Sequence, residues 1–433
     1  MSLGGGTFVT HNKVLPGTYI NFVSAAHTAA ASSDRGYVAM GLNLDWGPDN
    51  QVFTVTAEDF AKNSMKYFGY AYDAPELKGL RDLFLNATTL YAYKLNTGGT
   101  RATADVATAK YNGTRGNEIS ISSHKNVDDA TKFDVSTYMG TVKVDVQTVS
   151  DVKELKDNDY VTFTKTAALK EFAGIKLSTG TSGTVDSSGH QSMLNKLESY
   201  HFNILACPVK DEEIAKLYST YTKRLRDALG IKFQTVVYNY EADYEGVINV
   251  PNPTIDGSNE ASAVYFVAGL EAGTGTNESC GNREYKGEFV IKSDYTQTEL
   301  ADHIAKGHFV MHQQKDKVKT LDDINSLVTL TDEKGDVFQS NQTIRLNDDV
   351  AMAVASLFND RYVDLVHNDA AGRVSFWSDL VSMLNDRVAA RAIEEFDKDD
   401  IVIEQTGKKE ISVTYAYNVI NCMNKLYMKI TVG

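Results

Sequence analysis

The sequence predicts a multidomain mixed α/β (α+β) protein, with an α/β core, a small inserted β-rich domain and extended N- and C-terminal arms. Three observations support this prediction. Helical patterns alternate with short apolar strand patterns in two separate stretches, 23–98 and 186–341, which is typical of parallel strands joined by crossover helices. Strand patterns dominate the intervening residues, 99–185. Further strand patterns lie at both ends of the chain, outside these stretches.

Length, composition and charge exclude several classes of protein. A chain of 433 residues has room for two or three domains, and 42% hydrophobic with 23% charged residues describe a globular rather than a disordered protein. The net charge of −14 is spread along the chain without a basic patch. Because nucleic acid and anionic membranes are bound by clustered Lys and Arg, neither is expected as a main partner.

Cysteine usage and hydropathy indicate a protein made in a reducing cytoplasm. Cys207, Cys280 and Cys422 lie far apart without a Cys-x-x-Cys pair, so we expect free thiols, with Cys207 and Cys280 buried. The first residues have neither a basic region nor an apolar stretch, and no window approaches eighteen apolar residues. Neither secretion by a signal peptide nor membrane insertion is therefore expected.

In chain order, an arm comes first and α/β elements follow. Residues 1–22 begin rich in glycine, pass through Pro16-Gly17 and end in an alternating strand made of Thr18, Tyr19, Ile20, Asn21 and Phe22. Within 23–98, the predicted elements are a strand at 36–42, a helix capped by Thr56, a helix at 75–85 and a strand at 89–95.

The sequence pattern changes twice in the middle of the chain, from mixed helices and strands to strands alone and back. Glycine punctuation begins near Gly98, and strand patterns at 118–122, 141–148 and 160–164 predict the inserted β-rich domain, 99–185. In 186–341 the predicted strands are 202–208, 233–238, 246–250 and 308–313, with a turn between two more strands at 332–336. The predicted helices include one capped by Asp211, an apolar one at 259–272, and one that starts with the capping box Thr296 and Glu299.

The last segment, 342–433, is predicted to hold two helices, a hairpin and a terminal strand. Asp348-Asp349 introduce one helix, a longer one spans 375–396, and strands at 400–404 and 410–415 flank a turn. In the closing run Leu426, Met428, Ile430 and Val432 share one face, and Tyr427, Lys429 and Thr431 share the other. A strand at a chain end needs a partner for its backbone groups, either in its own subunit or on the sheet edge of a neighbour.

A search for catalytic or ligand-binding motifs finds little. Nucleophile elbows, phosphate loops, zinc-protease motifs and EF-hands have no match, and Gly273-Thr274-Gly275 follows a helix, where it is better explained as a helix stop. The best metal candidate is His308 with His312, four residues apart on one face, with His303 nearby, but no carboxylate accompanies them at a known spacing. We therefore predict no catalytic residue, no cofactor site and no metal site.

Several segments resemble contractile phage tail sheath proteins, particularly those of defective prophages and phage-tail-like bacteriocins of Gram-positive bacteria. Pro16 to Phe22 matches the family's Pro-Gly-x-Tyr-Ile-Asn-Phe element. Gly113-Thr114-Arg115-Gly116-Asn117 is similar to its pattern of a glycine, a spacer and Gly-Asn before a strand. The helix with Val267-Ala268-Gly269-Leu270 and the closing Ile430-Thr431-Val432 also resemble the family, so the likeness spans the chain.

The resemblance implies a structural subunit without enzymatic activity. Such subunits stack as hexameric rings around an inner tail tube, exchange terminal strands with neighbouring copies, and contract to drive the tube through a target envelope. By this resemblance, Thr18 to Phe22 and Leu426 to Val432 are the exchanged strands, and Trp377, Arg387 and Arg391 face the tube. The expected partners are further copies of the chain, the inner tube protein, and baseplate and tail terminator proteins, in a virion tail or tail-like particle assembled in the bacterial cytoplasm.

Two other functions stay open at this point. The alternation of strands and helices in 186–341 is compatible with an α/β enzyme that has no recognisable linear active-site motif. A surface-layer or adhesin subunit is the other possibility, and the missing signal peptide counts against it.

Overall fold

The fold is taken from a computed structural model of the chain, which describes residues 35–166 and 169–432. From Arg35 onward the chain forms one compact unit. The predicted N-terminal arm, with its strand Thr18 to Phe22, lies outside the described residues.

A six-stranded sheet forms the core, with the strand order β13-β12-β11-β1-β3-β2. The strands are β1 (Tyr37–Leu42), β2 (Val52–Thr56), β3 (Thr89–Lys94), β11 (Ile204–Cys207), β12 (Gln234–Tyr238) and β13 (Val247–Val250). All neighbours pair in parallel except β2, which is antiparallel to β3 at one edge. Strands from before and after the inserted domain therefore share one sheet, and the predicted α/β core is confirmed.

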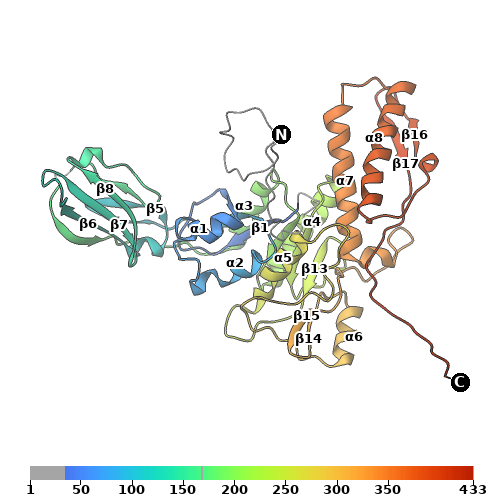
Figure 1. The fold of residues 1–433 in the computed structure, drawn as a ribbon, viewed down its shortest axis with the longest axis horizontal. Helices are drawn as coiled ribbons and strands as arrows, with labels where there is room; N and C mark the ends of the chain where they lie inside the picture. The colour runs from blue at the N-terminus through green and yellow to red at the C-terminus, as the bar shows by residue number, and fades with distance from the viewer. Residues whose placement is uncertain (1–34, 167–168, 433) are drawn as a thin grey trace, which may run out of the picture. The chain divides into compact units, whose positions relative to one another are not determined.

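Helices cover both faces of this sheet (Figure 1). They are α1 (Ala57–Phe68), α2 (Lys78–Leu83), α3 (Ser187–Leu197), α4 (Glu212–Lys223) and α5 (Ala263–Gly273). Because successive strand residues point to opposite faces, Val38 and Met40 pack with α1, α2 and α5, whereas Ala39 packs with α3 and α4. Burial on both faces explains why β11, β12 and β13 are apolar along most of their length.

The helices begin at the side-chain caps that the sequence predicts. The hydroxyl of Thr56 accepts a hydrogen bond from the backbone N–H of Asp59 (3.0 Å), and the carboxylate of Asp211 caps α4. Thr296 and Glu299 form a reciprocal capping box at the start of α6 (Gln297–Ala305). These caps satisfy backbone donors that have no partner inside the helix.

The inserted residues form two antiparallel sheets. One has the order β10-β6-β7-β8, and the other has the order β4-β5-β9. The strands are β4 (Arg101–Ala104), β5 (Ala107–Asn112), β6 (Ile119–Lys125), β7 (Phe133–Met139), β8 (Val142–Val149), β9 (Val161–Phe163) and β10 (Phe172–Lys176). Their shared core includes Ile121, Val135 and Val161, together with Trp46 from the α/β core. The indole of Trp46 thus packs in the core of the inserted domain and connects that domain to the α/β core.

Gly113 lies where the inserted domain meets the α/β core. Its φ of +137° disfavours any side chain, and a Cβ atom there would lie 1.8 Å from the carbonyl oxygen of Asp45. Next to it, the backbone N–H of Arg115 donates to the same carbonyl (3.2 Å), and its guanidinium donates to the carbonyl of Gly69 (2.8 Å). The glycine of this motif therefore permits close contact between the two backbones.

The C-terminal half adds two hairpins and three helices. A hairpin of β14 (Met311–Gln314) and β15 (Lys317–Thr320) follows α6. The chain then forms α7 (Asn341–Arg361), α8 (Ala370–Ala389), β16 (Val402–Gln405) and β17 (Ile411–Thr414). Leu346, Leu380, Leu384 and Ile393 form the centre of a separate small core around α7 and α8.

Three predicted elements differ from the structure. No described strand flanks residues 332–336, which lead into a short 3-10 helix, Asp336–Gln339. Asp348-Asp349 do not start a helix but lie inside α7, which begins at Asn341, and their carboxylates pair with Arg226 and with Arg387 in α8. The long helix predicted for 375–396 spans Ala370–Ala389 instead. It ends before Arg391, whose φ is +58°.

We predict that Gly113→Ala lowers the free energy of unfolding by about 2 kcal/mol or more, because it combines an unfavourable φ with a clash against Asp45. The matched control is Gly174→Ala in β10, where an added Cβ meets no atom within 4 Å. Urea unfolding of both variants checks this. Equal stabilities would contradict the role of Gly113 at the junction.

Candidate functional site

The last described residues divide into an anchored part and a free part. We call residues 417–424 the tail root and residues 425–432 the free end. The bonds that hold the tail root are Tyr417 Oη to Asn347 Oδ1 (2.8 Å), Ile420 N to Ala392 O (2.9 Å), Cys422 N to Gln342 Oε1 (3.0 Å), Asn421 Nδ2 to Thr343 Oγ1 (3.0 Å) and Asn424 Nδ2 to Asp322 Oδ1 (2.8 Å). Most of these partners lie in the first two turns of α7, so the position of that helix sets where the tail leaves the body.

The free end makes no comparable contact with the rest of the described chain. It has no helix or strand assignment (Figure 1), and none of its residues pairs with a described strand. Leu426 is 84% exposed, Tyr427 90% and Val432 88%, so both faces of the alternating pattern are in solvent. The predicted terminal strand is therefore not formed within the described chain, although its alternating sequence could pair with a sheet edge.

The hairpin of β16 and β17 offers such edges. Among the described strands, these two pair only with each other. A two-stranded hairpin leaves one row of backbone donors and acceptors open on each outer side. Val402 in β16 is 46% exposed, so the hairpin also presents apolar surface.

The three residues expected to face the tube have different surroundings. Arg391 is exposed just beyond the end of α8. Trp377 is half-buried, and its indole N–H donates to the carbonyl of Lys398 (3.3 Å). Arg387 donates to Asp349 in α7 (3.0 and 3.2 Å), so its charge is already paired within the subunit. Their role toward a tube stays a prediction.

The three histidines are arranged differently from the sequence-based expectation. His303 Nδ1 and His308 Nδ1 lie 2.8 Å apart, and His308 Nε2 lies 3.5 Å from a carboxylate oxygen of Glu241. His312 is instead opposite Lys319 in the β14–β15 hairpin. His308 therefore pairs with His303, which the turn after α6 brings close to it, and not with the candidate partner His312. Burial is the main cause of a lowered pKa at both His303 and His308.

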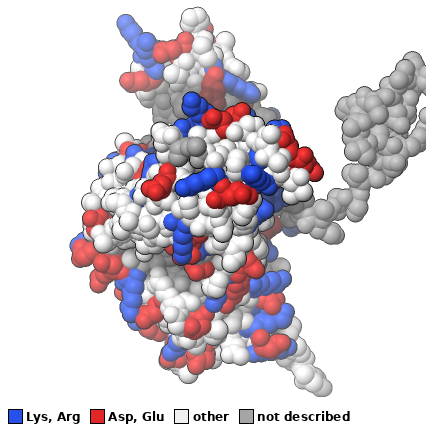
Figure 2. Space-filling model, turned by 90° about the vertical axis from the view of Figure 1, so that its left-hand side faces the viewer, with Lys and Arg blue, Asp and Glu red and all other residues white. Residues whose placement is uncertain are grey.

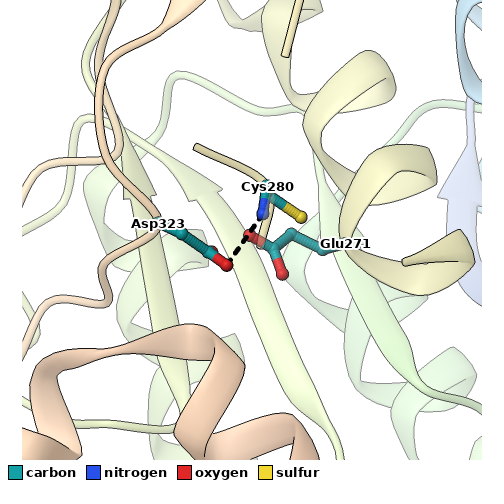
Figure 3. A group of neighbouring side chains, drawn as sticks. All are labelled: Glu271, Cys280 and Asp323. Atoms are coloured by element: carbon teal, nitrogen blue, oxygen red, sulfur yellow. Dashed lines mark hydrogen bonds between the residues drawn. The ribbon is translucent and has the colours of Figure 1, made fainter. Parts of the chain in front are cut away.

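A buried charged cluster, which the sequence did not indicate, lies beside the start of α7. Figure 3 shows Glu271 at the end of α5, Cys280 and Asp323, whose side chains lie close together, with the backbone N–H of Cys280 donating to Asp323 (2.9 Å). The guanidinium of Arg345 in α7 contacts both carboxylates, at 2.8 Å from Asp323. We call these four residues the Arg345 cluster; all of them are nearly or completely buried.

Burial and neighbouring charges shift the titration of this cluster. Burial is the largest cause of the raised pKa of Glu271, which is about 8, and the neighbouring charge of Asp323 adds to it. Burial also opposes ionisation of Asp323, but the Arg345 charge holds the pKa of Asp323 below its usual value. Burial and the two carboxylates raise the pKa of the Cys280 thiol well above its usual range.

The Arg345 cluster has metal-like spacing, but its chemistry suits an ion pair. One donor atom from each of Glu271, Cys280 and Asp323 lies within 4.8 Å of the others. The guanidinium of Arg345 already supplies the positive charge at this place, 3.7 Å from the Cys280 sulfur. A metal would also need the thiolate of Cys280, which the raised pKa disfavours. Cys207 and Cys280 are both buried free thiols, as predicted.

We predict that Glu271→Gln reduces the dependence of stability on pH between about 4.5 and 8. A carboxyl whose pKa is raised on folding stabilises the folded state fully below its unfolded pKa, and this stabilisation is lost as pH rises through the folded value. The free energy of unfolding, measured in urea from pH 5 to 9, should therefore fall less steeply in the variant. Glu299→Gln is the control, because the pKa of that capping carboxylate is lowered and its contribution lies below this window. Parallel curves for wild type and Glu271→Gln would contradict the assignment.

On the face that Figure 2 presents, basic and acidic side chains are interspersed, and no broad basic field is visible there. None of the helices in the described part of the chain combines the length and apolar character needed to cross a membrane.

Comparisons with known families match consecutive parts of the chain to one group of proteins. The matching models are the tail sheath protein Gp18 domain III N-terminal region (residues 35–95), the phage tail sheath protein beta-sandwich domain (97–184), the phage tail sheath protein central domain (183–326) and the phage tail sheath C-terminal domain (333–433).

Individual relatives agree with these matches. The phage-like element PBSX protein XkdK of Bacillus subtilis is 35% identical, over 83% of this chain and 84% of that protein. The crystal structure of a sheath tail protein from Desulfitobacterium hafniense has a TM-score of 0.77 and 32% identity, over 93% of this chain and all of that one. The helical sheath of the anti-feeding prophage in its contracted state shares the fold, with a TM-score of 0.57 at 11% identity over 97% and 99% of the two chains. The resemblance in the sequence motifs is thus confirmed, and the chain belongs to the phage tail sheath protein family.

Proposed function

We propose that the chain is the subunit of a contractile tail sheath, which polymerises as stacked hexameric rings around an inner tail tube and contracts to drive the tube through a target cell envelope. Membership of the sheath family supports this proposal, as does the fold shared with a sheath solved in its contracted state. The family is structural, and we assign no catalytic role. Contraction would then draw on energy stored in a metastable extended lattice.

The observation that carries the proposal is the exposed free end. Its alternating side chains have no partner surface in the described chain, whereas the adjoining tail root is held by specific hydrogen bonds. We infer that Leu426 to Val432 add a strand to an open edge of the β16–β17 hairpin of a neighbouring copy. Thr18 to Phe22 are proposed as the second exchanged strand. Main-chain pairing of this kind can persist while subunits rotate, because it does not depend on most side chains.

The wider arrangement follows the sequence-based division of the chain. We propose the segments 1–22, 23–98, 99–185, 186–341 and 342–433, with the inserted β-rich domain facing outward. The proposed partners are further copies of the chain, the inner tube protein, and baseplate and tail terminator proteins. The proposed location is a virion tail or tail-like particle assembled in the bacterial cytoplasm.

We predict that Met428→Pro blocks sheath assembly but leaves the subunit folded. Proline removes a backbone donor from the middle of the proposed strand, and Met428 is 72% exposed, so the free energy of unfolding should change by less than about 0.5 kcal/mol. Met428→Ala keeps the donor and serves as the control. Electron microscopy of each variant with the inner tube protein gives the readout. Normal sheaths from Met428→Pro would show that the free end does not pair as a strand.

We predict that Trp377→Ala combined with Arg391→Glu weakens binding to the inner tube. Arg391 is exposed at the end of α8, where a change of charge would be felt by a partner surface. Arg387→Ala should instead lower stability, by about 1 kcal/mol, because Arg387 is paired with Asp349. Co-sedimentation with preformed tubes separates the two effects. If only Arg387→Ala reduced binding, the assignment of Trp377 and Arg391 would be wrong.

A further inference from the structure

Arg35 and the tail root both connect to the Arg345 cluster through hydrogen bonds. Arg35, the first described residue, directly follows residues 1–34 in the chain. Its guanidinium donates to the carbonyl of Thr274 (2.9 Å) and to the carbonyl of Glu271 (3.0 Å). These carbonyls lie at the C-terminal end of α5, where a positive charge is favoured. Arg35 is thus fixed to the residue that also supplies a carboxylate to the Arg345 cluster.

The carboxylate of Glu271 holds the first turns of α7. Asn341 Nδ2 donates to it (3.2 Å), and the guanidinium of Arg345 binds it one turn later. No side chain caps the start of α7, and the backbone N–H of Asn341 donates instead to the carbonyl of Asp323 (3.0 Å). The backbone and the carboxylate of Glu271 therefore link Arg35 to the start of α7.

The tail root is attached to that same part of α7. Gln342 accepts from the backbone N–H of Cys422 and donates to the carbonyl of Ile420 (3.0 and 3.1 Å). Asn424 donates to Asp322, whose neighbour Asp323 belongs to the Arg345 cluster. Every step from Arg35 to the tail root is thus a direct hydrogen bond or an adjacent residue.

The charged groups between Arg35 and the start of α7 also affect one another electrostatically. The guanidinium of Arg345 contacts the carboxyl groups of Glu271 and Asp323, and the guanidinium of Arg35 binds the backbone carbonyl of Glu271. Burial, followed by the charge of Arg345, lowers the pKa of Arg35 to about 10. Loss of the Arg35 charge therefore changes the electrostatic environment of Arg345 as well as the end of α5.

We propose that Arg35, Glu271 and Arg345 act as positioning residues that couple the point where residues 1–34 join the body to the root of the C-terminal tail. A disturbance at Arg35 is transmitted through Glu271 to the first turns of α7 and loosens the tail root. The coupling is a property of the single subunit, so it goes beyond the proposed assembly function and does not rest on it.

Hydrogen exchange of the full chain, followed by mass spectrometry, tests this proposal. In Arg35→Met the peptide that contains the amide of Cys422 should exchange about tenfold faster, within the usual range of coupling between sites. Arg81→Met is the matched control, because Arg81 also donates to two backbone carbonyls and pairs with a carboxylate, but at α2. It should leave the Cys422 peptide unchanged.

A reciprocal variant keeps the test valid if Arg35→Met fails to fold. Asn424→Ala removes an exposed hydrogen bond of the tail root and leaves the core intact. Coupling is reciprocal, so this variant should speed exchange of the Thr274 amide at the end of α5. Exchange that rises only next to each substitution, or a tail root that loosens equally in Arg81→Met, would overturn the proposal. Neither result would bear on whether the chain forms a sheath.

Discussion

A buried guanidinium needs partners for its charge and its donors, and Arg345 finds them only where α7 meets the central α/β layers. It contacts Glu271, Asp323 and the carbonyl of Glu278. Removal of one partner from such a buried pair typically costs about 3–5 kcal/mol, so the register of α7 is tightly defined. A second, partly buried pair, Arg226 with Asp348, holds α7 against the same layers (2.6 and 2.9 Å). The C-terminal helices, the hairpin and the tail root all follow from this placement.

Membership of the sheath family suggests why the tail root is anchored and the free end is exposed. The proposed sheath subunit would hold its neighbours while the lattice rearranges, which requires a rigid body and attachment segments that leave it at defined points. The tail root meets the second requirement, because its bonds to α7 fix the point of departure, while the free end keeps its backbone and apolar side chains in solvent. The β16–β17 hairpin has open edges among the described strands, and such an edge could accept an added strand.

Local patterns predicted much of the fold. Period-two and period-3.6 patterns indicated the strands and helices of the α/β core, and capping residues such as Asp211 and Thr296 marked the helix starts, because these signals arise from neighbouring residues. The start of α7 was missed, since four of the five residues from Asn341 to Arg345 are polar and are buried by partners far away in the sequence. Arg345 lies 74 residues from Glu271 and 22 from Asp323, a separation at which no short motif operates.

The candidate site was predicted only in part. The alternation from Leu426 to Val432 was visible, but the anchoring of the tail root depends on which side chains α7 presents to it, which requires the tertiary structure. The histidines show the same limit, because spacing along the chain paired His308 with His312, whereas the turn after α6 pairs it with His303.

The most direct test of the central claim is a cryo-electron microscopy reconstruction of the full-length chain assembled with its inner tube protein. The account predicts stacked sixfold rings in which residues 426–432 of one copy pair with an outer edge of the β16–β17 hairpin of another. Discrete monomers in the presence of tubes, or rings in which this segment pairs within its own subunit, would contradict it.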